Sequence, residues 1–121
     1  MITDFLVLFR EPDGRSQPHS PAFTERHQQH WRDWLTKYNQ SGNLVGGQSL
    51  TLQGAILRNG QDPAQLGPHQ IDKEIVGGYL LLKAATLDEA ISIIRTCPIF
   101  EADGYAEIRE IMGASTKLIN T

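Results

Sequence analysis

The stretch EIVGGYLLLKAATLDEAISIIRTC, residues 74–97, decides the fold of this chain. Its first half, residues 74–85, is an apolar run that contains a Gly-Gly pair, and it predicts a strand. Its second half begins with Thr86 as an N-cap and has Glu89 at the capping-box position, which predicts a helix that Pro98 ends. The expected apolar face of this helix consists of Leu87, Ala90, Ile91 and Ile94.

The segments outside this stretch supply further strands. Residues 4–10 (DFLVLFR) form a short apolar run that ends at turn residues, which predicts a buried strand. Residues 105–112 (YAEIREIM) alternate with period two and predict the last strand. Residues 44–60 predict a hairpin, because short apolar runs are separated by Gly and Ser, and residues 61–73 predict a long polar loop.

A second helix is predicted near the N-terminus. Ser20 is a suitable N-cap, and Pro21 suits the first helical position. The apolar side chains that follow, as far as about Asn39, have helical spacing. The resulting order, β-α-β-β-β-α-β, predicts an α+β fold of the ferredoxin-like, split βαβ type, in which two helices cover one face of an antiparallel sheet.

The strands have more apolar positions than one covered sheet face needs. Residues 6–9 run Leu-Val-Leu-Phe, and residues 80–82 are all leucine. An apolar sheet face of this size is rarely left in water, so we expect a homodimer packed sheet to sheet. Residues 1–112 are expected to form a single domain, and residues 113–121 a polar C-terminal tail.

The composition excludes several classes of protein. The chain has 121 residues, 40% of them hydrophobic and 21% charged, and a net charge of -3 with scattered basic residues. These values predict a globular domain without a nucleic-acid partner. We find no apolar stretch long enough to cross a membrane. The single cysteine excludes a disulfide within the chain and favours the cytoplasm.

The segment HQQHWRDW, residues 27–34, contains the candidate functional residues. His27 and His30 are three positions apart, so they share one helical face with Trp31 and Trp34. An imidazole exchanges protons near neutral pH, so His30 is a candidate general acid/base, with His27, Trp31 and Trp34 around a ligand pocket. The alternative is structural: both histidines lie at the edge of the core and bond to backbone or water.

Metal and thiol chemistry are weaker candidates. No HExxH motif or second pair of ligands accompanies the two helix histidines, so we predict no metal and no cofactor. Cys97 lies at the end of a predicted helix, where the helix dipole disfavours a thiolate. A small buried residue is therefore the first interpretation of Cys97, and a nucleophile paired with His30 is the alternative. The residues considered as a third metal ligand are His19 and His69, which lie in predicted loops, and Asp33 of the predicted helix.

The chain resembles the YCII-related family, and within it the DGPF branch, from Phe5 to about Met112, most specifically in its C-terminal half. The matching features are a Gly-Pro turn, a Lys-Glu pair, a Gly-Gly-aromatic strand, an LDEA helix start, a Cys-Pro stop and a closing VEIRE-like strand. In this sequence they are residues 67–68, 73–74, 77–79, 87–90, 97–98 and 106–110. The family's Asp-Gly-Pro-Phe turn is replaced by Leu66-Gly67-Pro68-His69.

The resemblance implies a dimeric α+β barrel, and some relatives resemble small-molecule enzymes such as dehydrochlorinases of ring compounds. In those relatives a histidine of the first helix and an aspartate before the proline form an acid–base pair. His30 occupies the histidine position, but Cys97 occupies the aspartate position. Two functions therefore stay open: a cofactor-independent enzyme that uses His30, and a non-catalytic small-molecule-binding or regulatory module.

Overall fold

A four-stranded antiparallel sheet forms the body of the protein in a computed structural model that describes residues 2–12 and 19–113. In spatial order its strands are β2 (Leu44–Ser49), β5 (Glu74–Ala84), β1 (Thr3–Pro12) and β6 (Tyr105–Glu110). The two strands at the centre of the sheet, β5 and β1, pair in register from Thr3 opposite Ala84 to Phe9 opposite Gly78. This order is that of a ferredoxin-like fold, as the sequence predicted.

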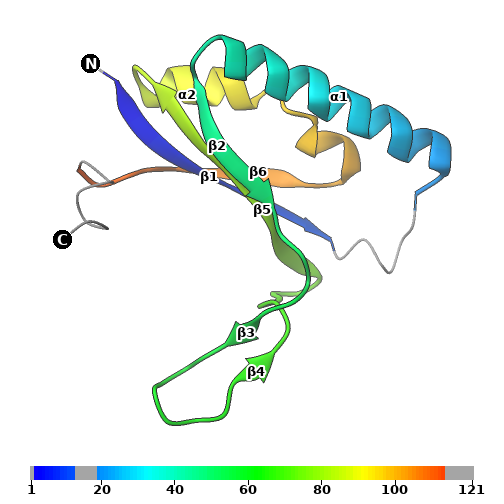
Figure 1. The fold of residues 1–121 in the computed structure, drawn as a ribbon, viewed down its shortest axis with the longest axis vertical. Coiled ribbons are helices and arrows are strands. Elements are labelled where there is room, and N and C mark those ends of the chain that lie inside the picture. Colours follow the sequence, from blue (N-terminus) through cyan, green and yellow to red (C-terminus); the bar gives the residue numbers. More distant parts are fainter. Residues whose placement is uncertain (1, 13–18, 114–121) are drawn as a thin grey trace.

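Two helices cover one face of this sheet (Figure 1). They are α1 (Pro21–Gln40) and α2 (Leu87–Ile94), and a short 3-10 helix, η1 (Pro98–Ala102), follows α2. Both predicted N-caps are present, because the Ser20 hydroxyl accepts the Phe23 N–H and the Thr86 hydroxyl accepts the Glu89 N–H. The expected tail lies outside the described residues, apart from Gly113.

The core lies between the sheet and the helices. Alternate residues of the central strands point into it, and α1 contributes Trp34. The predicted face of α2 was wrong at one end, because Leu87 is 49% exposed and Ile93 is buried. The buried stripe Ala90, Ile93, Ile94 and Cys97 instead has the i, i+3, i+4, i+7 spacing of a helix face. The strand residues of the core include Phe5, Val7, Phe9, Leu80, Leu82 and Ala84.

A separate two-stranded element, which we call the arm (residues 50–73), extends from the sheet on the side away from the helices (Figure 1). It contains β3 (Ala55–Ile56) and β4 (Gln65–Leu66), which pair with each other. The predicted hairpin over residues 44–60 was therefore wrong. β2 pairs with β5 instead, and the partner of β3 comes from the segment that was predicted to be a loop.

A bulge interrupts the pairing of β1 with β5. Phe9 is opposite Gly78 and Arg10 is opposite Val76, so Gly77 is an extra residue in β5. Bulges of this kind redirect the side chains that follow them. Here the bulge lies next to Glu11, at the end of β1 where a cleft opens.

Candidate functional site

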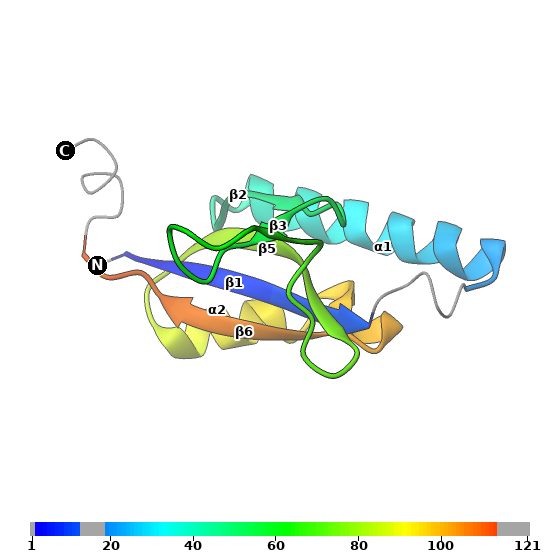
Figure 2. The ribbon, with the colours of Figure 1, turned by 90° about the horizontal axis from the view of Figure 1, so that it is seen from below.

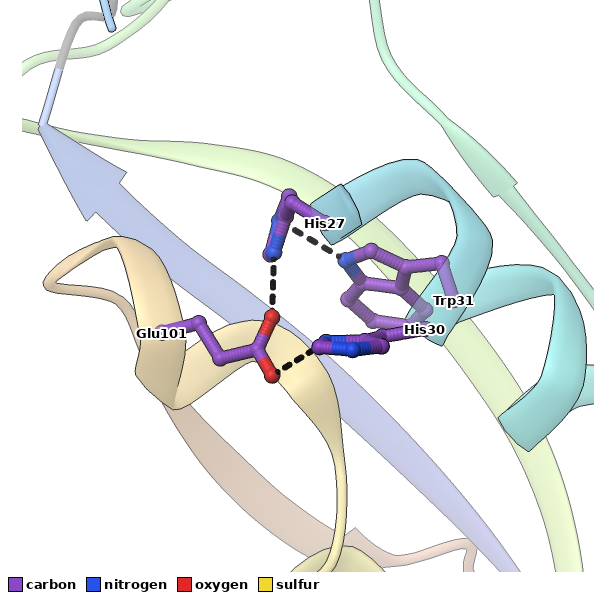
Figure 3. A network of polar contacts seen from close by, with 4 residues as sticks. All are labelled: His27, His30, Trp31 and Glu101. Atoms are coloured by element: carbon purple, nitrogen blue, oxygen red, sulfur yellow. Dashed lines mark hydrogen bonds and ion pairs between the residues drawn. The ribbon is translucent and has the colours of Figure 1, made fainter. Parts of the chain in front are cut away.

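Three side chains from two segments meet beside α1 and form the histidine–glutamate cluster: His27, His30 and Glu101 (Figure 3). The Glu101 carboxylate lies between the two imidazoles. Its Oε1 atom is 2.9 Å from His27 Nδ1, and its Oε2 atom is 2.8 Å from His30 Nδ1. Glu101 belongs to η1, which packs against α1 although the two segments are about seventy residues apart in sequence.

Packing fixes the position of η1. Gly104 follows it and donates its N–H to the Ile99 carbonyl oxygen at 3.2 Å. A Cβ atom at position 104 would lie 2.9 Å from that same oxygen and 2.8 Å from the Ile99 side chain. Glycine therefore allows the chain to turn tightly over Ile99, which holds Glu101 over the face of α1.

The hydrogen bonds of His27 determine its tautomer. The Trp31 indole N–H donates to His27 Nε2 at 3.1 Å, and an indole nitrogen can only donate. His27 Nε2 must therefore accept, which leaves the proton on Nδ1, where it is donated to Glu101. Both nitrogens of His27 are engaged, so this residue supports the cluster and has no lone pair left for a substrate.

His30 has one nitrogen available. Its Nδ1–H donates to Glu101, and no hydrogen bond from another described residue reaches its Nε2 atom. The side chain is 46% exposed, so a small molecule can approach it. A carboxylate on Nδ1 with Nε2 left for the substrate is the arrangement that orients a catalytic imidazole.

The two histidines also act on Glu101. Hydrogen bonding from His27, and then from His30, lowers the pKa of the Glu101 carboxyl below its ordinary value, although partial burial opposes the shift. The carboxylate is therefore ionised at neutral pH. It can stabilise a positive charge that develops on His30 during proton transfer.

Cys97 lies in the hydrophobic core and is 3% exposed. Burial raises the pKa of its thiol from 9.0 to about 12, a backbone hydrogen bond with Ile99 partly opposes this, and the charge of Glu101 adds to it. A thiol of this kind is neither ionised nor accessible at neutral pH. These observations favour the packing role of Cys97 over the nucleophilic one.

A cleft with a volume of about 730 Å³ opens between α1, β2 and β5. Of the residues expected at a pocket, Trp31 lines this cleft, whereas His27, His30 and Trp34 are not among its lining residues. Trp34 is buried and donates its indole N–H to the Thr96 hydroxyl at 2.9 Å. Trp31 is therefore the link between the cleft and the histidine–glutamate cluster.

Glu101 is the site residue that the sequence analysis missed. The family resemblance implies a carboxylate at position 97, but the residue there is Cys97, which carries a thiol. The available signal was an acid four residues further on, in PIFEAD after the Cys-Pro stop. A short helical turn after Pro98 brings that acid back toward the preceding elements.

Fold and site together define a ferredoxin-like α+β protein with an accessible carboxylate–imidazole pair. A family model described as the YCII-related domain matches residues 7–115, which is most of the chain. The chain therefore belongs to the YCII-related family. A search of the curated proteins gives no match.

A solved structure with a similar fold is the 5-chloro-2-hydroxyhydroquinone dehydrochlorinase of Burkholderia phenoliruptrix AC1100, in complex with 2,5-dihydroxybenzoquinone. The similarity covers 96% of this chain and 98% of that chain, with 18% sequence identity and a TM-score of 0.52. At this identity the comparison supports the α+β fold of the chain alone.

No helix in residues 2–12 and 19–113 is both long and apolar enough to cross a membrane. Over the same residues, no group of three or more His, Cys, Asp or Glu side chains is arranged to hold a metal ion.

Proposed function

We propose that this protein is a cofactor-independent enzyme that transfers a proton on a small organic molecule in the cytoplasm, with His30 as the general acid/base. The observation that carries the proposal is the 2.8 Å contact between Glu101 and His30 Nδ1, which leaves Nε2 open to a substrate. The carboxylate that is absent at position 97 is supplied by Glu101.

The proposed reaction uses two side chains of the protein, His30 and Glu101. His30 Nε2 removes a proton from an acidic C–H or O–H of the substrate, and Glu101 stabilises the resulting imidazolium. The imidazolium then returns the proton to the product or to the leaving group. General acid–base catalysis of this type contributes about 10²–10⁴-fold to a rate.

Two observations support a class of substrate: the ability of an imidazole to remove a proton, and the compound bound to the structural relative. That protein is named a dehydrochlorinase, and its complex contains a dihydroxybenzoquinone. Loss of hydrogen chloride requires removal of a proton, which an oriented imidazole can accomplish without a cofactor. We therefore propose a small ring compound with an acidic hydroxyl or C–H group as the substrate.

The alternative function is a non-catalytic binding or regulatory module. It would be favoured if His30 had no second titratable group beside it. Glu101 is such a group, and its hydrogen bond to His30 favours the enzyme.

NMR spectra of the histidine side chains test the proposal. In the wild type we expect His30 to carry its proton on Nδ1. Compounds from a panel of small phenols and carboxylic acids should shift its signals. His30→Ala should lower the turnover of any compound that reacts by about 100-fold or more. The control is His69→Ala, because His69 is an exposed histidine in the arm. If the His30 signals ignore every compound, the enzyme proposal is wrong.

We also propose that the protein is a homodimer formed through the face of the sheet opposite the helices, which we call the open face. Leu6 lies opposite Leu81, and Leu8 opposite Tyr79, so four large half-buried side chains form its centre. Figure 2 looks onto this face, with both helices behind the strands and the arm in front. The arm extends on this side of the sheet (Figure 1), and its Leu57 and Leu66 are 69% and 84% exposed.

A charge at the centre of the open face should prevent dimerisation. We expect the wild type to sediment with twice the 13.5 kDa mass of one chain, and Leu81→Asp to sediment as a monomer, because a buried unpaired carboxylate destabilises an apolar interface. Leu87→Asp is the matched control, because Leu87 is an exposed leucine at the start of α2. A wild type that is monomeric at high concentration would contradict the proposed dimer.

A further inference from the structure

Glu11 occupies an unusual position at the edge of the cleft. It follows the bulge in the β1–β5 pairing, and both Glu11 and the extra residue Gly77 line the cleft. A Cβ atom at position 77 would lie 1.7 Å from Glu11 Oε1. The carboxylate therefore fills the space that a side chain at position 77 would need, close against the backbone of β5.

The cleft that Glu11 borders has an apolar wall. It includes the Trp31 ring from α1, together with Leu35, Leu44 and Leu80, and neutral polar side chains such as Gln28 and Gln48 line the rest. The other charged residue among the described lining residues is Arg32, which is exposed and bonds through its guanidinium to Gln29 at 2.7 Å. A volume of about 730 Å³ is within the usual range for small-molecule sites. The cleft thus combines an aromatic wall with one partly buried acid.

The surroundings of Glu11 favour a cationic partner. Burial raises the pKa of the Glu11 carboxyl, and the nearby His27 partly opposes this. A positive ligand would restore the stabilisation that the carboxylate loses when water is excluded. An ammonium group also makes charge-assisted hydrogen bonds to a carboxylate and is attracted to an indole face.

We propose that the cleft binds a small aromatic amine, with its ring against Trp31 and its ammonium group on the Glu11 carboxylate above Gly77. This site lies beside the His30–Glu101 pair and does not depend on the chemistry proposed for that pair. Trp31 borders both, because its ring lines the cleft and its N–H is bonded to His27. Occupation of the cleft should therefore be detected at the Trp31 indole N–H.

Three probes with one carbon skeleton test the proposal: 2-phenylethylamine, 2-phenylethanol and phenylacetate. We expect the amine to shift the Trp31 indole signal in ¹H–¹⁵N spectra, and to bind at least about tenfold more tightly than the alcohol or the acid. Glu11→Gln should weaken amine binding by about tenfold or more, because it keeps the shape of the side chain and removes its charge.

Gly77→Ala is an independent variant that keeps the charge and moves it. The clashing atoms belong to the end of the flexible Glu11 side chain, and Gly77 is not among the residues with positive φ. We therefore expect the fold to persist while the carboxylate is displaced and amine binding weakens. Glu25→Gln is the matched control, because Glu25 is an exposed acid of α1 that does not line the cleft.

Three results would each overturn the proposal: no binding of the amine, equal binding of all three probes, or amine binding that survives both Glu11→Gln and Gly77→Ala. His30→Ala should leave amine binding intact. Loss of the proposed enzyme activity can thus be distinguished from loss of this site.

Discussion

Between pH 9 and pH 12 the protein is expected to lose roughly 4 kcal/mol of its free energy of unfolding through the Cys97 thiol alone. Burial holds the pKa of this thiol at about 12 in the native state, against an ordinary value of 9.0. In this window the unfolded chain has released the thiol proton and the native protein still binds it. The unfolded state is therefore favoured progressively as the pH rises, and the full contribution is present only below about pH 9.

Urea unfolding at intervals from pH 8 to pH 11 measures this loss, with Cys97→Ala as the comparison. Tyrosine and lysine residues titrate in the same range, but they are common to both proteins, so the difference between the two pH profiles reports Cys97. The variant starts from lower stability because it removes a buried group, but its stability should fall less steeply. Parallel profiles would show that the native thiol ionises freely, and would revive Cys97 as a nucleophile.

The fold was largely predictable because burial alternates along the strands. Phe5 and Val7 point toward the helices, while Leu6 and Leu8 lie on the open face, and the sequence shows this as a run that is too apolar for one face. The arm was not predictable, because two-residue strands such as β3 and β4 leave no periodic signal.

The site was predictable only on the side of α1. His27, His30 and Trp31 share a helical stripe, and that spacing is local information. Their partner comes from η1, and its position depends on the packing of Ile99 against Gly104 and on the turn after Pro98. The family pattern directed attention to position 97, whereas the carboxylate that meets the imidazoles belongs to Glu101. Contacts between distant segments of this kind are set by tertiary structure.

Trp34→Ala is expected to lower the free energy of unfolding by about 3–5 kcal/mol, which is the usual loss for a buried tryptophan. Trp34 is the buried residue of α1, and its ring packs against Trp31 and Tyr38 with centroids 5.9 Å and 5.1 Å away. Its N–H also joins α1 to Thr96, just beyond α2. For a domain of ordinary stability, about 5–15 kcal/mol, this is a large fraction of the total.

Trp34→Phe separates the two contributions of this side chain, because it keeps an aromatic ring and removes the bond to Thr96. We expect this variant to lower the free energy of unfolding, measured in urea, by about 1–3 kcal/mol, because the Thr96 hydroxyl loses a partner and the ring is smaller. The histidine signals of each variant show whether α1 still holds His27 and His30 against Glu101. If Trp34→Ala costs less than about 1 kcal/mol and leaves those signals unchanged, contacts other than Trp34 hold α1 on the sheet. The histidine–glutamate cluster itself, which joins α1 to η1, would then become the first candidate for that anchoring role.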